Sequence, residues 1–253
     1  MHALSIKSQA LSMATDSLYR NAHEVLPPSL NSTSPRPPLS DGTTRLYISY
    51  RSPFAQRAWI TRNYKGLQDQ IELVAIDLEN KPVWYREVYS EEKVPALEHN
   101  SKVIVESLNI IKYIDNHFEG PSLFPDDTAR REFGEEMISY SETFNEMVYN
   151  SFKGVTVREA DPAFDVLEAS FKKFDDGPFL LGQFSMVDIA YIPFVERAHI
   201  FLPEVWQYDI SNGRPKLAAW IEDMNKIDAY KQTKSDPKEI ITYYKKRFLA
   251  QQQ

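Results

Sequence analysis

Residues 45–76, RLYISYRSPFAQRAWITRNYKGLQDQIELVAI, carry the pattern that decides the fold. The stretch opens with apolar residues at every second position, which is the period of a β-strand, namely Leu46, Ile48 and Tyr50. Ser52 then supplies a helix N-cap with Pro53 at the first helical position, and Gly66 is placed to end that helix. The apolar run 71–76 follows as a buried strand. We therefore expect a strand–helix–strand unit whose two strands pair in parallel.

The next residues extend the same small sheet. The segment 82–89 begins with proline and reads as a short helix. The runs 94–97 and 102–105 read as the two strands of a hairpin, and an amphipathic helix opens at Ser107. Within residues 45–120 the order is therefore βαβ, a short helix and then ββα, which is the thioredoxin-like arrangement.

The remainder of the chain, residues 121–253, has only helical patterns. One long pattern covers 128–153, and Ser185 with Asp188 forms a capping box that opens a strongly apolar helix. We expect Ser185 and Asp188 to serve the fold and not to touch substrate. The expected fold class is an α/β thioredoxin-like N-terminal domain, residues 45–120, followed by an all-α C-terminal domain.

Residues 1–44 differ in composition from the rest. Five of the 16 prolines fall between positions 27 and 38, with serines and asparagines among them. Such a segment cannot bury a core of its own, so we expect it to be extended over the surface or disordered. Its first twelve residues lack acids and contain serine and lysine, which allows two readings, a plastid transit peptide or a disordered extension.

The composition excludes several classes of function. The formal net charge is -7, which argues against a general nucleic-acid binder because phosphates require a basic face. No apolar run approaches the roughly 18–20 residues of a membrane span. There are no cysteines, and the five histidines lack the spacing of a zinc site. We therefore expect no disulfide, no cysteine nucleophile and no metal.

Two motifs at predicted ends of the sheet are candidates for chemistry. Ser52 lies where a strand runs into a helix N-terminus, and there backbone N–H groups favour negative charge such as a thiolate. Read alone, Ser52 is an ordinary N-cap. Val94–Pro95 precedes a hairpin strand and suits a cis peptide bond that presents backbone groups to a peptide; read alone, Pro95 is an ordinary strand-start proline.

Two further motifs lie at the same edge. Glu106 and Ser107 stand between a strand and a helix start, where they suit the ammonium and carboxylate of an amino-acid head group, although a second capping serine is the simpler reading. Lys81 suits a distant carboxylate, although most such lysines are solvated. A tripeptide with a central thiol and a carboxylate at each end would use all of these positions, and that tripeptide is glutathione.

Six blocks of sequence, in order, resemble those of plant lambda-class glutathione S-transferases. They span residues 41 to about 249 and read DGTTRLYISY, SPFAQRAWITRNYKGLQ, KVPALEHNSKVI, ESLNIIKYIDNHFEGPSLFP, KFDDGPFLLGQFSMVDIAYIPFVER and RPKLAAWIEDMNK. The related omega class shares the KPxW, VPAL and ES elements. The resemblance implies glutathione as cosubstrate, a monomer in preference to a dimer, and a cytoplasmic location, with the plastid as the alternative if residues 1–44 include a transit peptide.

The resemblance also implies roles for single residues. The glutathione-contacting positions correspond to Phe54, Lys81, Val94, Glu106 and Ser107, and the cis-proline corresponds to Pro95. Members of the class carry a cysteine at the helix N-terminus, which forms a mixed disulfide with glutathione and reduces disulfides or dehydroascorbate. Here Ser52 occupies that position, with Arg51 where a small or apolar residue is usual.

Three functions follow as hypotheses. In the leading one, Ser52 is the catalytic residue of a glutathione transferase that acts on a small apolar or aromatic metabolite or xenobiotic, held between the domains. In the second, the chain is a glutathione-dependent thiol transferase or dehydroascorbate reductase whose cysteine has been replaced by Ser52. In the third, it is an isomerase, cyclase or ligand-binding protein that has abandoned thiol chemistry.

Overall fold

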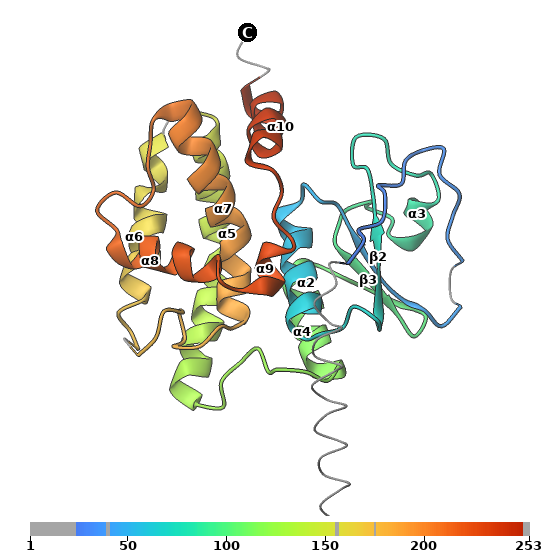
Figure 1. Ribbon diagram of the computed structural model, residues 1–253, viewed down its shortest axis with the longest axis horizontal. Helices are drawn as coiled ribbons and strands as arrows, with labels where there is room; N and C mark the ends of the chain where they lie inside the picture. Colours follow the sequence, from blue (N-terminus) through green and yellow to red (C-terminus); the bar gives the residue numbers. More distant parts are fainter. Residues whose placement is uncertain (1–23, 39–40, 155–156, 175, 250–253) are drawn as a thin grey trace, which may run out of the picture.

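The computed structural model describes residues 24–38, 41–154, 157–174 and 176–249. Figure 1 shows two parts side by side, a small sheet with its helices and a bundle of helices. The chain forms the sheet part first and the bundle second, which confirms the predicted thioredoxin-like plus all-α fold class. The two readings of the first twelve residues concern a segment that lies outside the described residues.

The sheet has the strand order β2-β1-β3-β4. β1 (Thr44–Ile48) pairs in parallel with β2 (Ile71–Ala75), as the strand–helix–strand unit predicts. β3 (Ala96–His99) runs antiparallel to β1 and to β4 (Lys102–Val105). The carboxyl ends of β1, β2 and β4 therefore meet the amino end of β3 at one edge of the sheet, where the connecting loops can share a ligand.

Two helices join the sheet to the bundle. α2 (Pro53–Tyr64) is buried on nearly every side, because Trp59 packs in the core of the sheet while Ile60 packs in the core of the bundle. α4 (Ser107–His117) divides its apolar residues in the same way. The short α3 (Tyr85–Val88) begins three residues later than the sequence predicts, because Pro82 starts a turn in which the Tyr85 N–H donates to the Pro82 carbonyl at 3.0 Å.

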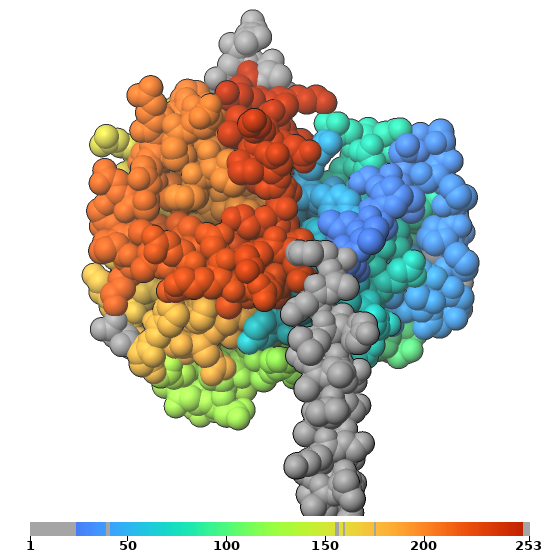
Figure 2. Space-filling model, viewed as in Figure 1, coloured from blue at the N-terminus to red at the C-terminus, as the bar shows by residue number. Residues whose placement is uncertain are grey.

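The bundle follows α4 and is wholly helical in the described residues. Its elements are α5 (Thr128–Phe152), the 3₁₀ turn η1 (Val157–Ala160), α6 (Asp161–Ser170), α7 (Met186–Trp206), α8 (Pro215–Met224), α9 (Asp228–Lys231) and α10 (Pro237–Leu249). Neither α9 nor α10 was predicted. Figure 2 shows α10, in red, at the boundary between the bundle and the blue and cyan sheet part.

The capping box at the start of α7 is present as predicted. The Ser185 hydroxyl accepts from the Val187 N–H at 3.2 Å, and the Asp188 carboxylate accepts from the Ser185 N–H at 2.9 Å. Asp188 also accepts from the indole N–H of Trp220 at 2.8 Å and from the Leu180 N–H at 3.2 Å. Asp188 is fully buried, so it ties α7 to α8 inside the core of the bundle.

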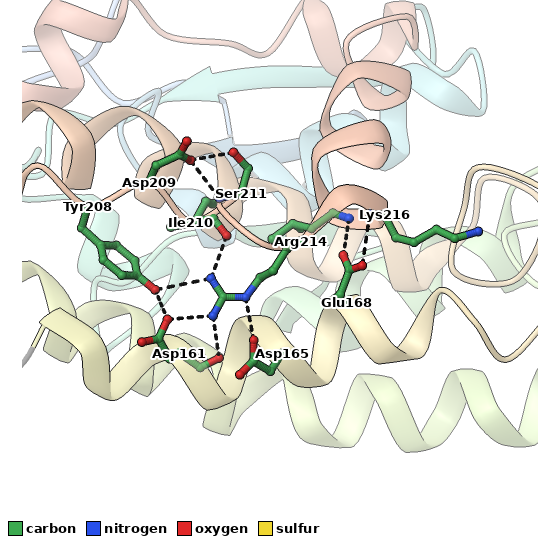
Figure 3. A network of polar contacts seen from close by, with 10 residues as sticks. Asp161, Asp165, Glu168, Tyr208, Asp209, Ile210, Ser211, Arg214 and Lys216 are labelled. Atoms are coloured by element: carbon green, nitrogen blue, oxygen red, sulfur yellow. Dashed lines mark hydrogen bonds and ion pairs between the residues drawn. The ribbon is translucent and has the colours of Figure 1, made fainter.

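A second polar cluster ties α6 to the start of α8 (Figure 3). Arg214 donates to the Asp161 and Asp165 carboxylates, at 2.7 Å each, and to the Ile210 carbonyl at 2.9 Å. The Tyr208 hydroxyl donates to Asp161 as well. Asp161 is the first residue of α6 and not its N-cap, which is Ala160, so its carboxylate is available to hold Arg214.

The N-terminal segment runs extended across the sheet part over residues 24–38. Leu30 forms a parallel bridge with Ile76 at the outer edge of β2, and its side chain packs against the apolar cluster on that face. The Tyr50 hydroxyl donates to the Pro27 carbonyl at 2.5 Å, and the Trp84 indole donates to the Ser34 carbonyl at 3.1 Å. This proline-rich stretch therefore has no core of its own and is held by packing against the apolar face of the sheet.

Candidate functional site

A pocket of about 470 Å³ opens at the sheet edge where the strand ends meet. Four loops of the sheet part line it, and α5 and α10 of the bundle close its other side. All the positions that the resemblance assigns to glutathione and its chemistry line this one pocket: Ser52, Phe54, Lys81, Val94, Pro95, Glu106 and Ser107. The fold brings together residues that are far apart in the sequence.

Ser52 occupies the N-cap of α2. Its hydroxyl oxygen accepts from the Ala55 N–H at 3.2 Å, and its side chain faces the pocket while the residue is 9% exposed. In the described residues the hydroxyl donates to no acceptor, so its hydrogen is available to a ligand. The positive end of the α2 dipole lies beside it. The site therefore favours an anion next to the Ser52 hydroxyl.

The hairpin side of the pocket begins at Val94–Pro95, whose peptide bond is cis as predicted. Lys81 lines the same pocket, with its ammonium 4.0 Å from the Glu92 carboxylate. Glu92 also accepts from the Arg86 guanidinium at 2.8 Å, so its charge is shared between Arg86 and Lys81. The Lys81 ammonium could therefore form an ion pair with a second carboxylate, supplied by a ligand.

Glu106 and Ser107 lie at the start of α4, but Ser107 is not the capping serine that the simpler reading expected. Glu106 holds the N-cap position with a φ of 66° and makes no side-chain cap, and Ser107 is the first helical residue. A positive φ in a residue with a side chain is uncommon and often marks a functional site. Here the carboxylate of Glu106 is exposed at the pocket while the Ser107 hydroxyl is buried at its floor.

Arg57, which the sequence reasoning missed, stands behind Ser107. It is 1% exposed; one guanidinium nitrogen donates to the Ser107 hydroxyl at 3.2 Å, and two donate to the Ala190 carbonyl of α7 at 2.9 and 2.6 Å. The guanidinium also lies 4.7 Å from the centre of the Phe194 ring. In the described part of the chain no carboxylate comes within ion-pair distance of it.

Burial lowers the pKa of Arg57 to about 9, so the side chain is still a cation at neutral pH. A buried cation without a counter-ion raises the electrostatic potential at the nearest opening, which here is the Ser107 end of the pocket. No sequence signal set it apart, because the same helix also carries Gln56, Arg62 and Asn63.

The bundle side of the pocket is aromatic and cationic. Phe54 packs edge-on against Phe194 with ring centroids 5.0 Å apart, and Tyr149, Tyr243 and Arg247 complete that side with Arg51. Tyr243 and Arg247 belong to α10, a helix that the sequence did not predict, so these two lining residues were not predicted either. Arg51, which the sequence marks as unusual for the class and as a positive charge near Ser52, lines this side of the pocket.

In the residues that the structure describes, no three or more His, Asp or Glu side chains gather as a metal ion would require. None of the helices placed there combines the length and the apolar character of a membrane span.

Comparison with known proteins gives the family. Residues 46–122 match the family described as "Glutathione S-transferase, N-terminal domain", and residues 143–223 match "Glutathione S-transferase, C-terminal domain". The chain is 60% identical to Glutathione S-transferase L3 of Arabidopsis thaliana, over 89% of this chain and 97% of that protein. It is 55% identical to Glutathione S-transferase L2, chloroplastic, of the same plant, over 88% and 77%.

Solved structures agree with this placement. A tau-class glutathione S-transferase from mango, Mangifera indica, superposes with a TM-score of 0.71 at 26% identity, over 81% of this chain and 99% of that one. The two family matches follow the order of the two parts of the fold, and the pocket is lined by residues of both parts. The chain therefore belongs to the glutathione S-transferase family and, within it, to the lambda class that its motifs predicted.

Proposed function

We propose that this glutathione transferase binds glutathione in the pocket between its two parts and uses Ser52 to activate the glutathione sulfur for attack on an electrophile. The observation that carries the proposal is the convergence of four separate loops on one pocket, with Ser52, Val94 and Ser107 spaced around it. Each loop supplies a group that suits a different part of the tripeptide.

The γ-glutamyl head group fits the start of α4. Its carboxylate would accept from the Ser107 hydroxyl and the free N–H groups of the helix N-terminus, with the Arg57 charge behind them. Its ammonium would pair with the exposed Glu106 carboxylate. The cysteinyl backbone would pair with Val94, and the glycyl carboxylate would reach Lys81, which lines the same pocket.

This placement brings the sulfur to Ser52. A free thiol has a pKa of about 8.5, and a hydroxyl donor together with a helix N-terminus lowers it. The Ser52 hydroxyl would donate to the thiolate, and the thiol proton would pass to water. The thiolate then forms a carbon–sulfur bond with the electrophile, whose leaving group takes the electron pair. The second substrate would be a small aromatic molecule beside Phe54.

Two head-group variants test the binding mode. We expect Ser107→Ala to weaken glutathione binding by roughly 1.5–3 kcal/mol, because a hydrogen bond to a charged group is lost. Glu106→Ala should weaken it as well. Ser90→Ala, an exposed serine that does not line the pocket, is the control. Calorimetry that finds unchanged affinity in both head-group variants would remove this binding mode.

A pair of substitutions at position 52 tests the chemistry. Ser52→Ala removes the donor and should lower the rate of conjugation of glutathione to an activated chloroarene. Ser52→Cys should create glutathione-dependent reduction of a disulfide, because a cysteine there would attack, accept glutathione as a mixed disulfide and be released by a second glutathione. The unaltered protein should lack this reductase activity. Robust reductase turnover by the serine form would contradict the mechanism.

Two properties of the whole protein stay predictions of the family resemblance. We expect a monomer, to be measured by light scattering at several concentrations. We expect a cytoplasmic protein, with the plastid as the alternative, to be measured by locating a fluorescent protein fused at the C-terminus of the full chain.

A further inference from the structure

We propose that the bundle side of the pocket selects aromatic ligands that carry a negative charge, such as an arene carboxylate, sulfonate or phenolate. The inference rests on the proposed function, since it names the class of second substrate for the same pocket. It depends on how two arginines and three aromatic rings are arranged beside the Ser52 end: Arg51, Phe54, Tyr149, Tyr243 and Arg247.

Arg247 supplies a cation that has no carboxylate partner in the part of the chain that the structure describes. Its guanidinium carbon lies 5.6 Å from the centre of the Tyr149 ring and 5.3 Å from that of Phe248, and one nitrogen donates to the Tyr243 hydroxyl at 3.3 Å. Within the described ranges no Asp or Glu oxygen comes within 4 Å of it. The rings fix the orientation of Arg247 but leave its charge unneutralised.

Arg51 adds a second cation on the same rim. Its guanidinium lies 5.5 Å from the centre of the Tyr243 ring and 3.5 Å from the Glu79 carboxylate. Glu79 also accepts from the Lys246 ammonium at 2.9 Å. One carboxylate is thus shared between two cations, with Arg247 as a third, and the rim has an excess of positive charge that attracts anions.

The rings supply the apolar half of the recognition. Phe54 is 37% exposed although it is large and apolar, and Tyr149 packs edge-on against Phe194 with centroids 5.7 Å apart. A flat aromatic ligand can stack against these rings. A neutral ligand in the same place could give the Arg247 guanidinium at most an uncharged hydrogen bond, whereas an anionic one would form a stronger, charge-assisted hydrogen bond.

The test compares two ligands of the same ring and nearly the same size, the anionic 2-naphthoate and the neutral 2-naphthamide. Their dissociation constants are measured by calorimetry on the full chain, with and without saturating S-methylglutathione, which cannot react. We expect naphthoate to bind roughly tenfold more tightly than naphthamide, as one charge-assisted hydrogen bond implies. Arg247→Gln should reduce that preference to about twofold or less, and Arg247→Lys should retain part of it.

The control is Lys245→Gln, which removes an exposed charge from the same helix without touching the pocket, and it should leave the preference unchanged. Equal affinities for the two ligands overturn the inference, as does a preference that survives Arg247→Gln combined with Arg51→Gln. If S-methylglutathione binds and the preference is absent, the inference fails and the proposed function stands. If S-methylglutathione does not bind, the proposed function fails, while naphthoate measured without it still decides the inference.

Discussion

Arg57 and Arg214 are both buried arginines that fasten one helix to another, yet in the described residues only Arg214 is paired with carboxylates. Arg214 donates to two carboxylates, Asp161 and Asp165, in the cluster of Figure 3, and none of these three residues lines the pocket. Arg57 holds a carbonyl and the Ser107 hydroxyl, and no carboxylate among the described residues. The first charge is balanced inside the fold, and the second is left for whatever enters the pocket.

The pKa directions express the same contrast. Burial acts to lower the pKa of Arg214, but its hydrogen bonds to Asp161 and Asp165 outweigh burial and raise it. At Arg57 burial prevails and the pKa falls to about 9. A buried ion pair is weak evidence of function, because structural networks form them too. A buried cation that lacks its anion is a better indication, since the missing partner can be a ligand.

The largest expected effect is on stability, at Arg214. Arg214→Met removes the bonds to both carboxylates, and we expect the free energy of unfolding to fall by about 2–3 kcal/mol, somewhat less than for a fully buried pair because Asp161 and Asp165 are partly exposed. Urea melts measure it. Glutathione affinity should not change. A variant of normal stability, or one that loses glutathione, would abolish the distinction between the two arginines.

Arg57→Met should show the reverse pattern. We expect glutathione affinity to fall roughly tenfold, because the charge and the hydrogen bond behind Ser107 are lost. The free energy of unfolding should change by about 1 kcal/mol or less, because replacing a buried charge by an apolar side chain of similar size is often neutral. The same melts and calorimetry serve, with Arg214→Met as the matched control. A large loss of stability with intact affinity would make Arg57 a purely structural residue.

Asp188, a buried anion with hydrogen-bond donors but no cation within ion-pair distance among the described residues, should show the smallest effect. Burial raises its pKa to about 6 against the hydrogen bonds from Leu180, Trp220 and Ser185 that lower it. Since the ordinary value is 3.8, the folded chain holds a proton that the unfolded chain has already lost between these pH values. The contribution of Asp188 to stability is therefore complete below about pH 4 and declines as the pH rises to about 6.

The measurement is the difference in unfolding free energy between the unaltered protein and Asp188→Asn, which has no titrating group at this position. That difference should decrease by on the order of 1 kcal/mol from pH 4 to pH 6 and stay level above pH 7. A difference that grows with pH over this range would mean that the donors outweigh burial.

The parts of the fold that could be predicted are those written in local patterns. The βαβ unit follows from the period of its strands and from Ser52, Pro53 and Gly66, and the capping box follows from four adjacent residues. Such signals depend on backbone geometry within one or two turns, so no tertiary information is needed to interpret them.

The parts that could not be predicted depend on contacts across the chain. The guanidinium of Arg57 reaches both α7 and α4, and only the tertiary fold brings these helices together there. For the same reason the Ser107 hydroxyl accepts a hydrogen bond from Arg57 and does not cap α4, as the simpler reading expected. Tyr243 and Arg247 reach the pocket from the last described helix. The pocket residues of the sheet part were predicted from motifs and from resemblance, whereas the bundle side required the fold.

The contact between Leu30 and Ile76 has a consequence for anyone who shortens the protein. Leu30 donates to the Ala75 carbonyl at 2.8 Å and accepts from the Asp77 N–H at 2.9 Å, so it occupies backbone groups at the outer edge of the sheet. A chain cut to begin at Thr44 would leave that edge open as a template on which other chains can add strands. Removing the proline-rich N-terminal segment to improve solubility would then promote aggregation instead.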